Sequence, residues 1–125
     1  MIVLDASALL AFLFRETGHE VVGQHEDACI STVNMSEVAG RFVRDGIDPA
    51  PLLDKISAST IQVVPFTLTQ AIYAARLLQL TSRFGLSLGD RACLGLAHER
   101  GVAVLTADTV WVGLATINVE VMLVR

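Results

Sequence analysis

The sequence has few of the residues that mark several common protein classes. Its only two cysteines, Cys29 and Cys93, lie inside apolar segments, so we expect buried reduced thiols rather than a disulfide framework. No apolar run reaches the roughly 18 residues that cross a membrane. The opening residues, Met1–Leu4, lack the basic region of a signal peptide. These absences predict a cytoplasmic protein that does not associate with a membrane.

Charged residues are also scarce, at 18% of the chain against 53% hydrophobic residues. This composition excludes a disordered chain and favours a sheet covered by helices. The formal net charge of −4 counts against a protein that coats nucleic acid in bulk. It is compatible with an enzyme that gathers acids in one cleft and basic residues around it. At 125 residues we expect one domain, residues 1–125.

Short apolar runs alternate with helical patterns along the whole chain. We expect strands at Met1–Leu4, Ala28–Ile30, Ile61–Val64, Val102–Leu105 and Ile117–Val124. Helices are expected at Ala6–Phe14, His19–His25, Leu52–Ala58, Thr67–Leu80 and Leu88–Arg100, with another that carries Glu37 up to Gly46. This alternation predicts an α/β fold, a three-layer α/β/α sandwich around a central parallel sheet.

Four acidic residues stand near the expected ends of these strands. Asp5 directly follows the first strand, and Asp108 follows the fourth. Glu37 lies three residues into the helix after the second strand, and Asp90 lies in the first turn of the helix that leads to the fourth. Because parallel strands end at one edge of a sheet, at least three of these acids are predicted to share that edge.

Each acid taken alone has a simpler interpretation as a helix cap. Asp5 and Asp108 suit the N-cap position, and the segments 34–37 and 87–90 resemble capping boxes. Taken together, four carboxylates without a counter-charge would raise one another's pKa, which is unfavourable. A bound divalent cation removes that cost, and oxygen ligands suit Mg²⁺ or Mn²⁺. We therefore expect a metal site formed by Asp5, Glu37, Asp90 and Asp108.

Six further polar residues are candidates for supporting roles. Ser7, Thr106 and Asn34 lie two or three residues from an acid, where they either orient a carboxylate or make local turn bonds. Arg41, Arg44 and Arg91 lie near the acids, where they either bind phosphate groups or belong to a solvated face.

These motifs resemble the PIN domain, and within it the VapC-type ribonuclease toxins of toxin–antitoxin pairs. The resemblance rests on four segments: Ile2-Val-Leu-Asp5-Ala-Ser7-Ala, Ser36-Glu37-Val38, Ser87-Leu-Gly-Asp90-Arg91 and Val104-Leu-Thr106-Ala-Asp108. It implies a five-stranded sheet of order 3-2-1-4-5 and cleavage of RNA that depends on Mg²⁺ or Mn²⁺. It also implies a homodimer, inhibited by a VapB-type antitoxin whose C-terminal segment wraps the toxin.

The same resemblance assigns roles to individual residues. Asp5, Glu37, Asp90 and Asp108 fall on the acidic quartet of the family, and Ser7 and Thr106 fall on its supporting hydroxyl positions. One departure is Thr109, where many relatives carry a basic residue, which leaves the substrate preference open.

Three other interpretations compete with a nuclease. A haloacid-dehalogenase-like phosphatase needs an aspartate where this chain has Ser7. A phospho-receiver domain needs a lysine at the end of a late strand, and the only lysine is Lys55, in a predicted helix. The remaining alternative is a PIN-like scaffold that binds RNA or a protein without cutting, which needs no metal.

Overall fold

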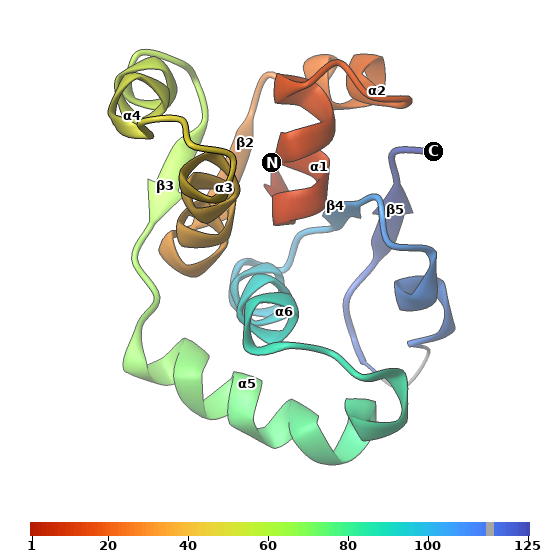
Figure 1. The fold of residues 1–125 in the computed structure, drawn as a ribbon. Helices are drawn as coiled ribbons and strands as arrows, with labels where there is room; N and C mark the ends of the chain where they lie inside the picture. The colour runs from red at the N-terminus through yellow and green to blue at the C-terminus, as the bar shows by residue number, and fades with distance from the viewer. Residues whose placement is uncertain (115–116) are drawn as a thin grey trace.

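The computed structural model describes residues 1–114 and 117–125. Its centre is one parallel sheet of five strands in the order β3-β2-β1-β4-β5, which confirms the predicted order 3-2-1-4-5 (Figure 1). The strands are β1 (Ile2–Leu4), β2 (Ala28–Ser31), β3 (Gln62–Val64), β4 (Val104–Thr106) and β5 (Val121–Leu123). The first strand of the chain is therefore the middle strand of the sheet.

Helices cover both faces of this sheet. They are α1 (Ala6–Leu13), α2 (His19–Gly23), α3 (Thr32–Arg44), α4 (Ala50–Ser57), α5 (Leu68–Thr81) and α6 (Leu88–Arg100), with short 3₁₀ turns η1 (Ser82–Phe84) and η2 (Thr109–Gly113). Figure 1 shows α5 in green and α6 in cyan at the bottom of the view, apart from α1, α2 and α4 at the top. The arrangement confirms the predicted three-layer α/β/α sandwich.

Two separate hydrophobic cores lie on the two faces because successive side chains of a strand point in opposite directions. On β1, Ile2 and Leu4 join the core under α1 to α4, whereas Val3 joins the core under α5, α6 and η2. On β4, Leu105 belongs to the first core and Val104 to the second. The central strands β1, β2 and β4 are thus buried on both sides, and the polar groups of the site collect at the edge of the sheet.

Two junctions bring the chain directly from a strand into a helix at the carboxyl edge of the sheet. After β1, Asp5 is the single residue before α1, and its N–H donates to the Leu105 carbonyl at 3.0 Å. After β2, α3 begins at once, and the Ser31 side chain caps it by accepting from the Val33 N–H at 3.2 Å. Such short connections leave Asp5 and the start of α3 little freedom to move.

Several boundaries differ from the sequence expectation by one or two residues, among them those of β4 (Val104–Thr106) and α4 (Ala50–Ser57), and two differ by more. The last strand covers Val121–Leu123 rather than Ile117–Val124, because its neighbour β4 offers only three residues for pairing. Helix α3 starts at Thr32, so Glu37 is its sixth residue and lies beyond the first turn, and the expected capping box at 34–37 is wrong. Within the described residues, no helix is long and apolar enough to cross a membrane.

Candidate active site

The four acids come together around one pocket of about 380 Å³ at the carboxyl edge of the sheet. Asp5 reaches it from the end of β1, Glu37 from α3, Asp90 from the first turn of α6, and Asp108 from the end of β4. The lining is completed by Ala6, Ser7, Leu10, Gly40, Arg41 and Arg44. Groups separated by about a hundred positions in the sequence therefore share one small polar space.

The Asp5 carboxylate is held on one side by two hydroxyl groups. Ser7 Oγ donates to Asp5 Oδ2 at 2.6 Å, and Thr106 Oγ1 donates to the same oxygen at 2.9 Å. Asp5 occupies the N-cap position of α1, but its side chain makes no capping bond to that helix. The simple capping interpretation is therefore wrong for Asp5, and both hydroxyl groups bond the same oxygen, Oδ2, and not Oδ1.

The same two hydroxyls join the end of β1 to the segment after β4. Ser7 Oγ accepts from the Ala107 N–H at 2.9 Å, and Thr106 Oγ1 accepts from the Asp108 N–H at 3.0 Å. The two hydroxyl oxygens are themselves 3.2 Å apart. Each hydroxyl thus donates to Asp5 while accepting from the backbone beside Asp108, which fixes the distance between the two acidic segments.

Glu37 is oriented by Asn34, one helical turn before it. Asn34 is fully buried, and its Nδ2 donates to Glu37 Oε1 at 2.8 Å and to the Gly89 carbonyl at 2.9 Å. The side-chain amide therefore ties Glu37 on α3 to the first turn of α6. Of the two interpretations of Asn34, the structure agrees with the one in which it orients a carboxylate.

Asp90 and Asp108 do act as helix caps. Asp90 forms a capping box with Ser87, in which the Ser87 N–H donates to Asp90 Oδ2 at 2.9 Å and the Asp90 N–H donates to Ser87 Oγ at 3.1 Å. Asp108 Oδ1 accepts from the Val110 N–H at 3.0 Å at the start of η2. Each of these two carboxylates therefore caps a helix and also lines the acidic pocket.

Burial and mutual repulsion raise the pKa of three of these acids. Burial is the main cause of the raised pKa of Asp5; hydrogen bonds from Ser7 and Thr106 oppose it, and the charge of Asp90 adds to it. For Glu37, partial burial of the carboxyl group and the charges of Asp5 and Asp90 raise the pKa against the bond from Asn34. Burial and the charge of Asp108 raise the pKa of Asp90 against its bonds to Ser87. Each carboxylate is thus less stable ionised here than in water.

The donor set fits a hard divalent cation, although the side chains are not grouped around one point. In the described part of the chain, no three histidine, cysteine or acidic side chains form a ready metal site. In Asp90 and Asp108, one carboxylate oxygen accepts from a backbone amide. All four groups nevertheless offer oxygen to the same pocket, and such ligands suit Mg²⁺ or Mn²⁺.

The three arginines separate into two groups. Arg41 and Arg44 line the pocket one and two turns after Glu37, and Arg41 is held there by Asp45 at 3.1 Å and by the Phe14 ring at 5.1 Å. Arg91 turns away, since its Nη1 donates to the Ala74 carbonyl of α5 at 3.0 Å. The structure therefore brings Arg41 and Arg44 to the acids, but not Arg91.

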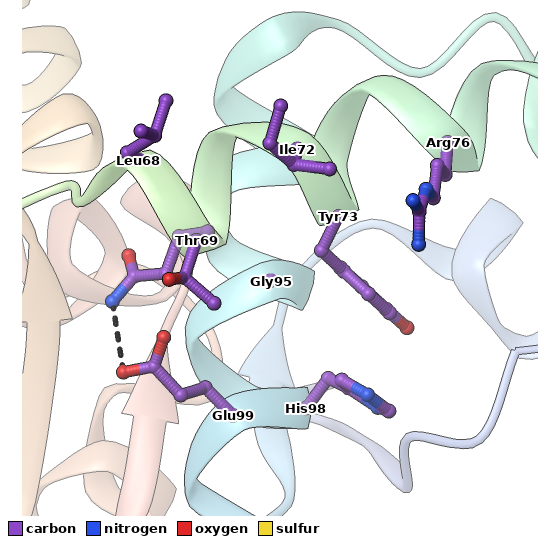
Figure 2. A pocket seen from close by; sticks show the side chains of 9 residues that line it. Leu68, Thr69, Ile72, Tyr73, Arg76, Gly95, His98 and Glu99 are labelled. Carbon is purple, nitrogen blue, oxygen red and sulfur yellow. Dashed lines mark hydrogen bonds between the residues drawn. The ribbon is translucent and has the colours of Figure 1, made fainter.

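A larger cavity, of about 630 Å³, lies between α5 and α6 and contains none of the four acids (Figure 2). Tyr73 and His98 stack there with ring centroids 4.1 Å apart, and Gln70 Nε2 donates to Glu99 Oε1 at 3.3 Å. Its wall is largely apolar, formed by residues such as Leu68 and Ile72. We therefore place the candidate active site at the smaller, acidic pocket.

Gly89 was missed by sequence reasoning although it contacts Glu37 directly. A Cβ at this position would overlap the Glu37 carboxylate. The available signal was a glycine inside a helix, where glycine is unfavourable and often has a packing or functional reason. Trp111, three residues after Asp108, is 1% exposed and belongs to the core under α6.

Comparison with protein families matches the PIN domain to residues 2–116. Comparison with curated proteins gives no match. Among solved structures, VapC20 of Mycobacterium tuberculosis, described as a sarcin–ricin-loop-cleaving toxin, superimposes with a TM-score of 0.76 at 15% identity, covering 96% of this chain and 99% of that one.

Two toxin–antitoxin complexes are similar as well. The complex from Klebsiella pneumoniae gives a TM-score of 0.73 at 16% identity, covering 100% of this chain and 98% of the other. VapBC2 from Rickettsia felis, bound to a promoter DNA fragment, gives 0.73 at 14% identity, with 98% of each chain covered. At these identities the likeness establishes a common fold.

Proposed function

This chain belongs to the PIN-domain family, and from that premise we propose that it is a metal-dependent endoribonuclease, the toxin of a type II toxin–antitoxin pair. The observation that carries the proposal is the gathering of Asp5, Glu37, Asp90 and Asp108 around one pocket. None of the ion pairs within the described residues involves any of these four acids. A site of this kind favours a cationic ligand over a neutral one.

The four acids would hold Mg²⁺ or Mn²⁺, with Asp5 offering Oδ1 because Ser7 and Thr106 already bond Oδ2. When bound, such a cation lowers the pKa of a water molecule, polarises the phosphate and stabilises the leaving oxygen. The two hydroxyls keep Asp5 and Asp108 at a fixed separation. The supporting bonds thus hold the ligand groups in place before substrate arrives, which lowers the cost of ordering them.

The chain's own residues would position water and phosphate. Asn34 bonds Oε1 of Glu37, so that Oε2 is the oxygen that orients the attacking water or accepts its proton. Arg41 and Arg44, at the pocket wall, would bind the phosphates that flank the cleaved bond. The water oxygen bonds to phosphorus and the bond from phosphorus to O3′ breaks. The products carry 5′-phosphate and 3′-hydroxyl ends.

The test is cleavage of total cellular RNA by the purified protein with Mg²⁺, with Mn²⁺ or with EDTA, and with Asp5→Asn as the matched variant. We expect discrete cuts with 5′-phosphate ends in the two metal arms and none with EDTA or with the variant. Equal cutting by the Asp5→Asn protein would refute the assignment of the site. Binding of RNA by the folded protein without any cutting would instead favour a non-cleaving PIN-like scaffold.

A VapB-type antitoxin and a homodimer complete the proposal. Similarity to chains of toxin–antitoxin complexes supports a partner of this kind. Expression of the protein in a bacterial host should arrest growth, and co-expression of its VapB-type antitoxin should restore growth. The Asp5→Asn protein should not arrest growth. Arrest by the variant equal to that by the wild type would argue against toxicity through RNA cleavage.

A further inference from the structure

Gly89 is the residue immediately before Asp90, in the first turn of α6, and it is buried. A Cβ at this position would overlap the carboxyl carbon and both oxygens of Glu37. The other glycine inside α6, Gly95, has the Gln70 carbonyl as its closest neighbour, at an ordinary contact distance of 3.4 Å. The missing side chain at position 89 therefore creates the space that the Glu37 carboxylate occupies.

Backbone conformation does not account for this glycine. Gly89 lies within the regular helix α6 and is not among the glycines with positive φ. Glycine in such a place is unfavourable compared with alanine, because it loses more conformational freedom on folding. Close approach of the Glu37 carboxylate is the remaining physical reason for the residue, since only glycine lets that group lie directly on the helix.

Asn34 bonds both the carboxylate and the helix that it lies against. Its Nδ2 donates at once to Glu37 Oε1 and to the carbonyl of Gly89 itself, so the amide joins the two residues that touch. Its Oδ1 is buried and has no hydrogen-bond partner among the described residues. An unpartnered buried oxygen is unfavourable, which indicates that the orientation of this amide is fixed by its two donor bonds.

We propose that Gly89 and Asn34 are positioning residues that hold the Glu37 carboxylate against the first turn of α6, beside Asp90. The proposal rests on the proposed function in one respect, that Glu37 is one of the groups that hold the cation. What it adds is a specific contact between two helices. On α6, the missing side chain of Gly89 leaves a space, and α3 provides both the Glu37 carboxylate that fills this space and the Asn34 amide that fixes it.

Alanine at position 89 should displace the carboxylate without unfolding the protein. The group that a new Cβ would meet is the far end of a flexible side chain, which can swing aside while both helices stay in place. Shortening that side chain by one methylene, in Glu37→Asp, removes the overlap. The two substitutions should therefore compensate for each other, as neighbouring sites that share one space do.

The experiment measures Mn²⁺ binding to the purified, RNA-free protein by electron paramagnetic resonance, together with the NMR signals of the Asn34 side-chain amide. For Gly89→Ala we expect Mn²⁺ affinity to fall by about tenfold or more, as for other residues that support metal ligands. We also expect shifted Asn34 signals and faster hydrogen exchange. Gly95→Ala, a matched substitution in the same helix, should leave both measurements unchanged.

The double variant Gly89→Ala/Glu37→Asp tests whether the two substitutions act through the same space. Adding Gly89→Ala to Glu37→Asp should lower Mn²⁺ affinity by less than twofold, and this pair remains informative if Gly89→Ala alone folds poorly. An equal loss in both backgrounds would overturn the proposal, as would wild-type affinity and unchanged Asn34 signals in Gly89→Ala. If the wild type binds no Mn²⁺, the proposed function fails, and the Asn34 signals alone then decide whether Gly89 and Asn34 hold Glu37.

Discussion

Two pockets of the molecule differ in how they are built. The acidic pocket, about 380 Å³, is formed by groups from α1, α3, α6 and the ends of β1 and β4. The cavity between α5 and α6, about 630 Å³, is formed by two helices that follow one another in the chain. In the pocket, Thr106 bonds Asp5 across 101 positions, whereas Gln70 and Glu99 in the cavity are 29 positions apart.

This difference shows that the size of a cavity and the arrangement of polar groups around it are separate properties. A gap between two helices forms wherever their side chains are small or splayed, and Gly95 on α6 faces Gln70 and Tyr73 there. The acidic pocket requires polar bonds between segments that meet only in the folded chain. If the comparison is correct, substitutions in the pocket should affect RNA cleavage strongly, and substitutions in the cavity should not.

The largest effect is expected from Asp5→Asn. It removes a charge that faces the pocket while keeping an oxygen that can accept from Ser7 and Thr106. We expect kcat/KM for RNA cleavage to fall by more than about 100-fold, since residues that only support metal ligands already contribute about 10–100-fold. Initial rates on a defined RNA, with circular dichroism as a check of folding, measure this. A loss of kcat/KM below tenfold would contradict the expectation that substitutions in the acidic pocket affect cleavage strongly.

Thr106→Val should have the next largest effect, a loss of about 10–100-fold in kcat/KM. Valine keeps the shape of the fully buried side chain but removes the hydroxyl between Asp5 and the Asp108 N–H. Thr106→Ser, which retains the hydroxyl, is the control and should remain close to the wild type. Equal activity of the valine and serine variants would mean that this hydroxyl does not position the acids.

Arg41→Ala and Arg44→Ala should weaken RNA binding several-fold. Each lost phosphate contact is expected to reduce the slope of log affinity against log salt concentration by about one. Binding isotherms of the Asp5→Asn protein at several salt concentrations separate binding from cleavage. Arg83→Ala, on η1 and outside the pocket, is the control. If the slope for each arginine variant equals that for the control, neither arginine contacts the RNA phosphates.

Stability of the metal-free protein should fall as the pH rises. The pKa values of Asp5, Glu37 and Asp90 are raised in the folded state, so folding favours their protonated forms. Their contribution is therefore complete below the ordinary carboxyl pKa of about 4 and is lost as the pH passes through the raised values. Saturating Mn²⁺ should reverse the trend, because the cation binds the ionised carboxylates.

Asp5→Asn tests this pH dependence one group at a time. In EDTA, its melting temperature should exceed that of the wild type by a margin that grows between pH 4 and pH 7. Asp54→Asn, which neutralises an exposed carboxylate on α4, should show no such margin. A constant difference between Asp5→Asn and the wild type across this range would show that burial of Asp5 does not oppose its ionisation.

The smallest effect is expected in the larger cavity. His98→Ala removes the ring that stacks on Tyr73, so we expect unchanged RNA cleavage and a stability loss within about 1 kcal/mol, the scale of one aromatic pair. Urea denaturation and cleavage rates measure the two quantities. A tenfold loss of cleavage would mean that this cavity takes part in the reaction and that the contrast between the two regions is false.

The sequence predicted the parts of the molecule that follow from periodicity and from the geometry of a parallel sheet. Asp5 and Asp108 directly follow apolar runs, and these runs form β1 and β4, which pair in the sheet. Their approach to one edge follows from the fold class alone. The start of α3 was misplaced because Asn34 looked like a cap, whereas Ser31 provides the cap and Asn34 bonds across to α6.

Bonds between distant segments could not be predicted, because no local pattern encodes them. Asn34 reaches the Gly89 carbonyl 55 positions away, and nothing near either residue specifies the other. Arg91 shows the converse case, since it is adjacent to Asp90 in the sequence. Neighbours in a helix point about 100° apart, and the Arg91 side chain accordingly reaches α5 rather than the acids.

The position of β1 at the centre of the sheet has a consequence for synthesis on the ribosome. Three of the four acids precede Val104, the first residue of β4, but Thr106 and Asp108 follow it. A nascent chain that stops short of β4 therefore carries Asp5, Glu37 and Asp90 without the strand that pairs with β1 and brings in the fourth acid. We expect the growing chain to remain harmless to the RNA around it until this late strand has emerged and paired.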